Sequence, residues 1–148
     1  MGKKQLTLLF GGDISVGEDS SKYFQSVNTI LDNADVRIAQ LEEPYVSEVT
    51  DFAGINRTTQ VLSPMVGKMD ILTLAGNHFY DFGDRGVKDT IDWCNNNGIV
   101  CCGGGMNIEE AEKPGFFEKD GVKFGVLAYN AQGPKTSFAD VDKAGTSY

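Results

Sequence analysis

Residues 70–102, DILTLAGNHFYDFGDRGVKDTIDWCNNNGIVCC, decide the expected fold, because a strand, a helix and a second strand follow one another within them. The opening apolar run predicts a buried strand over residues 70–76. A helix is expected over residues 84–97, before Gly98, a residue type that commonly ends helices. Its apolar seam at helical spacing consists of Val87, Ile91 and Cys94. The run GIVCCGGG, residues 98–105, predicts the next strand, and such a unit is typical of a parallel sheet.

The rest of the chain extends this pattern. Apolar runs predict strands over residues 5–13 and 35–44, and a helix over residues 20–34 with Ser20 or Ser21 as its N-cap. The expected inward face of that helix consists of Phe24, Val27, Ile30 and Leu31. The remaining expected segments are a loop over residues 45–59, a short helix over residues 63–69 with Ser63 as its N-cap, a helical turn over residues 107–112 and a hairpin over residues 115–130 with Asp120 and Gly121 in its turn. We therefore expect an α/β fold, a mainly parallel sheet with helices on both faces, followed by a C-terminal β-hairpin.

Charge and composition exclude several classes of protein. The net charge of -8 argues against a nucleic-acid-binding role through a basic surface. No apolar run is long enough to span a membrane, and the N-terminus lacks the pattern of a secretory signal. The three cysteines show neither disulfide-framework nor zinc-site spacing, which favours a reducing compartment. We expect a cytoplasmic protein, with an envelope-associated location as the alternative if the natural N-terminus differs.

Polar side chains follow three consecutive strands of the expected sheet. Asp13 ends the first strand, Glu42 the second, and Asn77 and His78 the third. Because functional groups of such sheets gather outside the carboxyl ends of the strands, we expect these side chains to converge on one rim. Carboxylate and amide oxygens suit Mg²⁺ or Mn²⁺, and an imidazole adds affinity for Zn²⁺. Asp81, three residues after His78, is close enough in sequence to hold the imidazole ring.

Each of these residues also has an ordinary structural explanation. His78, the only histidine in the chain, could pack in the core or cap a helix. Asp13 could accept hydrogen bonds in a turn, and Glu42 could be a solvated loop residue. Asn77 could occupy a left-handed backbone conformation. Their joint occurrence at three strand ends favours a functional site over these separate explanations.

Four segments of the chain carry a family resemblance. They read GGDISVGE from residue 11, AQLEEP from residue 39, LTLAGNHFYDFGDRGVKDTIDW from residue 72 and GIVCCGGGMNIEEAEKPGFFEKDGVKFGVLAYN from residue 98. In order and spacing they resemble the poly-γ-glutamate capsule-synthesis (CapA-like) proteins of the calcineurin-like metallophosphatase superfamily. The resemblance extends from Leu6 to about Asn130.

The resemblance implies a metal-dependent hydrolytic site. It makes Asp13, Glu42 and Asn77 ligands of one or two divalent ions, with Mn²⁺, Mg²⁺ and Zn²⁺ as candidates. His78 becomes the group that meets a phosphate or leaving oxygen, and Asp81 the carboxylate that orients its ring. In the two-metal scheme, the ions and the histidine together stabilise charge on the transferring oxygens.

The chain departs from the family pattern at several positions. Gln40 and Gly76 stand where the family has Asn, and Glu18 stands where it commonly has Arg. Family members also continue with further strands that supply histidine ligands, whereas this chain ends at Tyr148. We therefore expect residues 1–148 to be the N-terminal portion of a CapA-like metallophosphatase domain, a half-domain in which metal binding is weak or absent and hydrolysis is slight.

Two main functional hypotheses follow. The first is a CapA-like protein of poly-γ-glutamate capsule or envelope polymer biosynthesis, with a metallophosphatase-type hydrolase site that is incomplete in this chain. The second is a non-catalytic module that binds an anion or another ligand, or assembles with a partner. No residue specifies the substrate, whether polymer or phosphoester. A homo-oligomer is also expected through residues 122–130, VKFGVLAYN, where Phe124, Val126 and Leu127 would lie on an exposed sheet edge.

Overall fold

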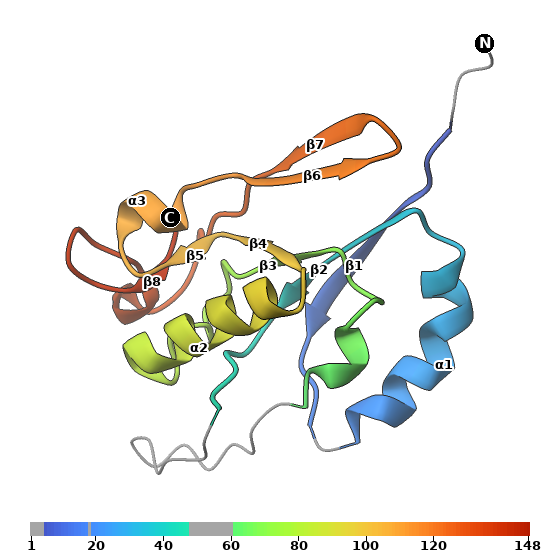
Figure 1. Ribbon diagram of the computed structural model, residues 1–148. Helices are drawn as coiled ribbons and strands as arrows, with labels where there is room; N and C mark the ends of the chain where they lie inside the picture. The colour runs from blue at the N-terminus through green and yellow to red at the C-terminus, as the bar shows by residue number, and fades with distance from the viewer. Residues whose placement is uncertain (1–4, 18, 48–60) are drawn as a thin grey trace.

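The computed structural model describes residues 5–17, 19–47 and 61–148, and most of the expected loop over residues 45–59 lies outside them. Four parallel strands form the main sheet in the order β1-β2-β3-β4 (Figure 1). These strands are β1 (Leu8–Ile14), β2 (Val36–Leu41), β3 (Ile71–Thr73) and β4 (Val100–Cys102). The connections between them contain α1 (Ser20–Asp32), the 3-10 turn η1 (Ser63–Met65) and α2 (Gly83–Asn96). The expected α/β class with a parallel sheet is confirmed.

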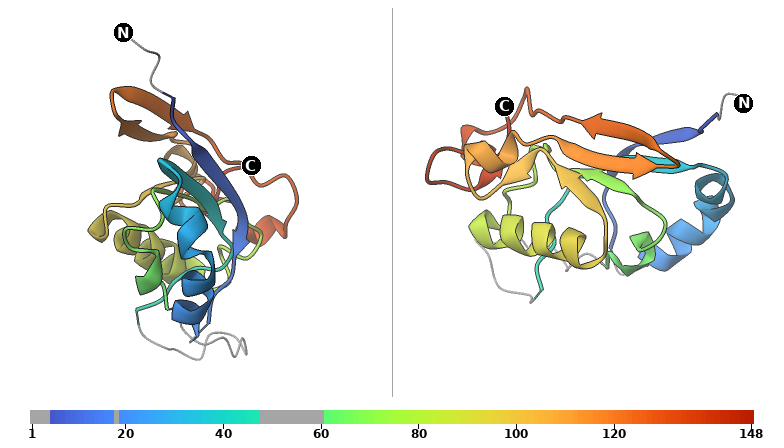
Figure 2. Two further views of the ribbon diagram at one scale, coloured as in Figure 1. Left: turned by 90° about the vertical axis from the view of Figure 1, so that its right-hand side faces the viewer. Right: turned by 45° about the horizontal axis from the view of Figure 1, so that its top comes forward.

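Both long helices pack against the same face of the main sheet (Figure 2). Leu31 of α1 and Val87 of α2 share one buried cluster with Leu72 of β3. This arrangement corrects the expectation of helices on both faces. The strands are added in one direction along the sheet, and successive right-handed crossovers in one direction place every helix on the same face.

A β-hairpin covers part of the opposite face (Figure 2). It consists of β6 (Gly115–Lys119) and β7 (Val122–Val126), joined by Asp120 and Gly121 as predicted. Both turn residues have positive φ angles, 53° and 82°, which is the requirement of a two-residue type I′ turn. The contact with the main sheet is made by Phe117, Phe124 and Val126, which pack against Val36, Ile38 and Ile71. The prediction that Phe124 and Val126 lie on an exposed edge is therefore wrong, because the alternation of the strand turns them inward.

The helix termini agree with the sequence pattern in α2 and differ in α1. Gly98 follows α2 with φ +68°, the left-handed conformation that terminates a helix. Asp19, rather than Ser20 or Ser21, is the N-cap residue of α1, and Leu62, rather than Ser63, precedes η1. The exposed fractions of Val27 and Ile30 are 41% and 59%, so the buried stripe of α1 is narrower than expected. Since α1 lies over the β1 side of the sheet, it covers an edge and buries fewer of its residues.

The C-terminal segment returns to the carboxyl end of the main sheet. β5 (Gly104–Gly105) pairs antiparallel with β8 (Gly145–Thr146), and the backbone N–H of Ser147 donates to Gly103 at 3.1 Å. Two short helical segments, α3 (Ile108–Ala111) and η2 (Lys135–Ser137), flank this pair. None of the helices among the described residues has the length and apolar character needed to cross a membrane.

Candidate functional site

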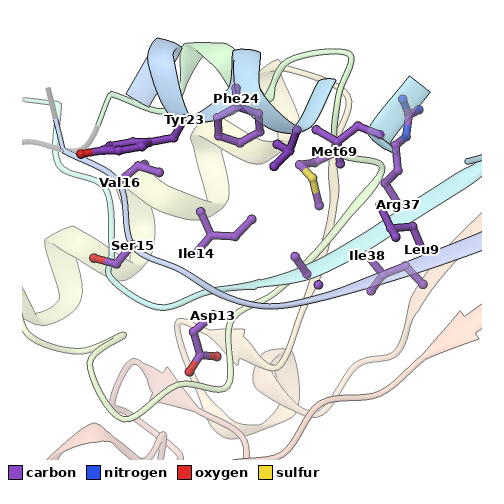
Figure 3. Close-up of a pocket in the computed structure, with 14 residues that line it drawn as sticks. Leu9, Asp13, Ile14, Ser15, Val16, Tyr23, Phe24, Arg37, Ile38 and Met69 are labelled. Carbon is purple, nitrogen blue, oxygen red and sulfur yellow. The ribbon is translucent and has the colours of Figure 1, made fainter. Parts of the chain in front are cut away.

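Asp13 stands near the carboxyl end of β1, where pairing with β2 is irregular. The register shifts between Phe10 and Asp13, so the intervening glycine pair forms a bulge before Asp13 comes opposite Gln40. The Asp13 side chain points away from α1, on the other side of the strand from Ile14 (Figure 3). Asp13 therefore faces the hairpin side of the sheet.

Glu42 follows β2 directly, and its N–H donates to the carbonyl of Ile14 at 3.0 Å. Burial and the nearby negative charge of Asp13 raise the pKa of the Glu42 carboxyl above its ordinary value. A hydrogen bond from Gln40 Nε2 to Glu42 Oε2, 3.4 Å long, acts in the opposite direction, as does the proximity of His78. Two carboxylates within reach of each other repel when both are ionised, so this end of the sheet favours a proton or a cation.

His78 lies in the turn between β3 and α2, and Asp81 holds its ring as predicted. The Nδ1 of His78 is 2.8 Å from the Oδ2 of Asp81. The buried side chain of Phe79 anchors this turn, and the backbone N–H of Asp81 donates to the carbonyl of His78 at 3.0 Å. The exposed fractions of the two side chains are 38% for His78 and 21% for Asp81. Because Asp81 binds Nδ1, Nε2 is the ring nitrogen that remains for another contact.

Asn77 lies at the same end of the sheet but is exposed. Gly133 of the C-terminal segment lies nearby, since a Cβ added to it would be 3.3 Å from the Asn77 Cβ. The structure thus brings Asp13 and His78 within electrostatic reach of Glu42. Asn77 precedes His78 in the chain, and its exposed side chain makes no contact with these three among the described interactions. Within the described ranges, no group of three or more His, Cys, Asp or Glu side chains forms a ready metal-binding cluster.

Two contacts near the site were not predicted from the sequence. The sequence marks Gln40 only as a departure from the family pattern, although its spacing of two residues from Glu42 on a strand places both side chains on one face. Lys143 had no sequence signal, because its partners are backbone carbonyls of the C-terminal segment. Its Nζ donates to the carbonyls of Thr136 at 2.7 Å and Phe138, and burial lowers its pKa.

Lys143 ties the C-terminal segment to the loop that carries His78. Its Nζ lies 4.2 Å from the centre of the Tyr80 ring, in a cation–π contact. The Tyr80 hydroxyl donates to Asp84 at 2.8 Å, and burial together with this carboxylate raises the pKa of Tyr80 to about 12. These contacts connect the C-terminal segment with the turn between β3 and α2 and with α2 itself.

A separate apolar pocket of about 340 Å³ lies between α1 and β1 (Figure 3). Phe24 of α1, Ile14 of β1 and Met69 line it, together with other apolar side chains. Asp13 stands at its margin but points away from it, toward the other side of the strand (Figure 3). The pocket is therefore distinct from the carboxylate and histidine groups at the carboxyl end of the sheet.

Comparison with protein families gives one match. The family model described as "Bacterial capsule synthesis protein PGA_cap" matches residues 7–147. This range contains all five residues of the candidate site as well as the hairpin and the C-terminal segment. No curated protein sequence matches the chain at a significant level.

Proposed function

The chain belongs to the bacterial capsule synthesis protein family, and on that premise we propose that it acts in the biosynthesis of a capsule or envelope polymer through a metallophosphatase-type, metal-dependent hydrolytic site. The observation that carries this proposal is the pair formed by Asp13 and Glu42, which sits at the ends of neighbouring strands and within reach of His78. Poly-γ-glutamate is the polymer that the family resemblance points to.

The donor set fits a hard divalent cation. Asp13 and Glu42 would supply carboxylate oxygens, and Asn77 an amide oxygen, which are the ligand types of Mg²⁺ and Mn²⁺. The like-charge interaction that raises the pKa of Glu42 is relieved when a cation stands between the two carboxylates. Three oxygen ligands leave much of the coordination to water, so we expect a dissociation constant on the order of 0.1 to 1 mM.

The residues around this position have separate chemical roles in the proposal. A bound divalent ion supplies Lewis-acid polarisation of a phosphoryl or acyl oxygen. When its ring is protonated, His78 donates a hydrogen bond from Nε2–H to the leaving oxygen and delivers that proton to it. Asp81 fixes the ring through the 2.8 Å contact with Nδ1, which determines which nitrogen faces the substrate.

A Mn²⁺ titration, followed by the electron paramagnetic resonance of the free ion, tests the proposal. We expect the unaltered protein to bind Mn²⁺ and the variants Asp13→Asn and Glu42→Gln to lose at least about tenfold in affinity, because each loses a charged ligand. Glu112→Gln is the matched control, since Glu112 is an exposed carboxylate of α3's C-terminal end. Equal affinity in all four proteins would contradict the assignment. Hydrolysis of a generic phosphodiester in the presence of Mn²⁺ then tests whether the site is catalytic.

A second candidate function rests on the apolar pocket beside α1. Its lining by Phe24, Ile14 and Met69 would suit an apolar ligand, as in a non-catalytic binding or assembly module. Absence of Mn²⁺ binding, combined with binding of an apolar fluorescent probe that Phe24→Ala abolishes, would favour this second function over the first.

A further inference from the structure

Gly76, which follows β3, is buried against the side chain of Gln40. A methyl group added to Gly76 would lie 2.9 Å from the Nε2 of Gln40 and 3.4 Å from the backbone carbonyl oxygen of Glu42. Cβ atoms in folded proteins essentially never lie within 3.0 Å of such a neighbouring heavy atom, so one of the two groups has to move. The space that a side chain at position 76 would fill is therefore occupied by the carboxamide of Gln40.

Gln40 uses this space to reach Glu42. Residues 40 and 42 are two apart at the end of β2, so their side chains project to the same side. The Nε2 of Gln40 donates to the Oε2 of Glu42 over 3.4 Å, and the carboxylate can only accept, which fixes the orientation of the amide. Asp13 lies opposite Gln40 in the register of β1 and β2. Gln40 therefore has Asp13 as its neighbour across the strands and Glu42 as its neighbour along the chain.

We propose that Gly76 and Gln40 form a positioning pair for Glu42. Gly76 leaves room for the carboxamide, and the carboxamide holds the Glu42 carboxylate in the orientation that faces a divalent cation together with Asp13. A neutral donor restricts the carboxylate without cancelling the charge that the cation needs. This inference rests on the proposed function, because it assigns an additional role within the same site.

The geometry predicts how a substitution at Gly76 acts. The atom nearest to an added methyl group is the end of a flexible side chain, so the Gln40 carboxamide swings away while the backbone keeps its place. Gly76→Ala should therefore fold and yet lose the hydrogen bond to Glu42. Gly17→Ala is the matched control, because an added methyl group there meets no atom of the described residues within 4 Å, its chain neighbours aside.

Mn²⁺ affinity in a double-mutant cycle tests the pair. We expect Gly76→Ala and Gln40→Ala each to weaken Mn²⁺ binding about three- to tenfold, the effect of losing one charge-assisted hydrogen bond to a ligand. The double variant should be no weaker than either single variant, because both remove the same contact. Losses that multiply in the double variant, or single variants that bind like the Gly17→Ala control, would overturn the inference. Should Gly76→Ala fail to fold, Gln40→Leu, which keeps the bulk and removes the donor, takes its place.

A second readout separates this inference from the proposed function. If the unaltered protein binds no Mn²⁺, the proposed function fails, and the side-chain amide signals of Gln40 in a ¹H–¹⁵N NMR spectrum then decide the positioning pair. We expect Gly76→Ala and Glu42→Gln to shift these signals in the same direction, and Gly17→Ala to leave them in place. Unchanged Gln40 signals in Gly76→Ala would overturn the inference even where Mn²⁺ binding is intact.

Discussion

The Nδ1 of His78 lies 2.8 Å from the Oδ2 of Asp81, three residues further along the same turn. Because Asp81 can only accept when ionised, this contact requires the proton of the neutral imidazole to sit on Nδ1 and leaves Nε2 as the acceptor. The partly exposed ring of His78 is therefore oriented before any substrate arrives.

Asp81→Leu should change the tautomer of the imidazole. With no carboxylate at Nδ1, we expect a substantial share of the neutral ring to carry its proton on Nε2. Ring ¹⁵N chemical shifts measure this directly, and the signals need no assignment because the chain has one histidine. Asp84→Asn is the control, since Asp84 accepts from Tyr80 instead. The same tautomer in the unaltered protein and Asp81→Leu would show that the contact does not set the ring.

Glu42→Gln should stabilise the metal-free fold at neutral pH. The pKa of Glu42 is raised in the folded state, so ionisation costs folding free energy once the pH exceeds the unfolded-state value of about 4.5. The unfolding free energies of the unaltered protein and of Glu42→Gln should be similar near pH 4. As the pH rises through the folded-state pKa of Glu42, the unfolding free energy of the unaltered protein should become the lower of the two. We expect a difference below about 1 kcal/mol at pH 7, because solvent screens the site. Urea unfolding at both pH values measures it.

If the difference in unfolding free energy between Glu42→Gln and the unaltered protein were the same at every pH, ionisation of Glu42 would not be its cause. Glu112→Gln serves as the control, because Glu112 is an exposed carboxylate. Its substitution should change the unfolding free energy little at either pH. Mn²⁺ at a concentration that saturates the unaltered protein should reduce or reverse its difference in unfolding free energy from Glu42→Gln, since it stabilises the protein with the higher affinity more.

Asp89 of α2 anchors the segment that follows Glu42. It accepts hydrogen bonds from the N–H and the Oγ of Ser47, each 2.9 Å long. Burial opposes ionisation of Asp89, but these hydrogen bonds and the charge of Arg85 outweigh it and lower its pKa. We expect Asp89→Ala to cost about 1 to 2 kcal/mol of unfolding free energy at neutral pH.

The cost of Asp89→Ala should shrink in acid. A carboxyl with a lowered folded-state pKa stabilises the fold above its unfolded-state pKa of about 4 and loses this contribution as the pH falls through the folded-state value. Asp92→Ala is the control, because the Asp92–Lys88 pair is exposed and should contribute little to the free energy of unfolding. Equal costs for the two variants in urea unfolding would show that Asp89 is not an anchor.

The parallel sheet was predictable from the sequence because its strands are continuous apolar runs that end in turn residues. The helix placement was not, since it depends on the order in which strands join the sheet, and that order is a tertiary property. The exposure of Ile30 also depends on tertiary structure. The apolar face of α1 is wider than the edge of the sheet that the helix covers, so part of that face stays exposed.

The candidate site was predictable to a similar degree. The convergence of Asp13 and Glu42 follows from neighbouring parallel strands, and the contact between His78 and Asp81 follows from a three-residue spacing in a turn. Lys143 could not be predicted in the same way, because it binds backbone carbonyls that no residue pattern marks.

Self-association of the chain remains a prediction, now placed on the outer face of the hairpin. The exposed fractions there are 73% for Phe116, 60% for Leu127 and 54% for Tyr129. Since exposed apolar patches promote association, we expect light scattering at micromolar concentration to detect dimers or larger species that Phe116→Ser/Leu127→Ser disperses. Val141→Ser, which replaces another exposed apolar residue, should leave the distribution unchanged. A monomeric unaltered protein would contradict this prediction.

Paramagnetic broadening by Mn²⁺ tests whether a divalent ion binds beside Glu42 and His78. The ring proton signals of the one imidazole report on any Mn²⁺ bound near it. We predict that Mn²⁺ below its dissociation constant broadens these signals in the unaltered protein and that an excess of Mg²⁺ restores them. In Glu42→Gln the same Mn²⁺ addition should leave the signals sharp. Signals that stay sharp in the unaltered protein, or that broaden equally in Glu42→Gln, would show that Glu42 does not hold a divalent ion beside His78.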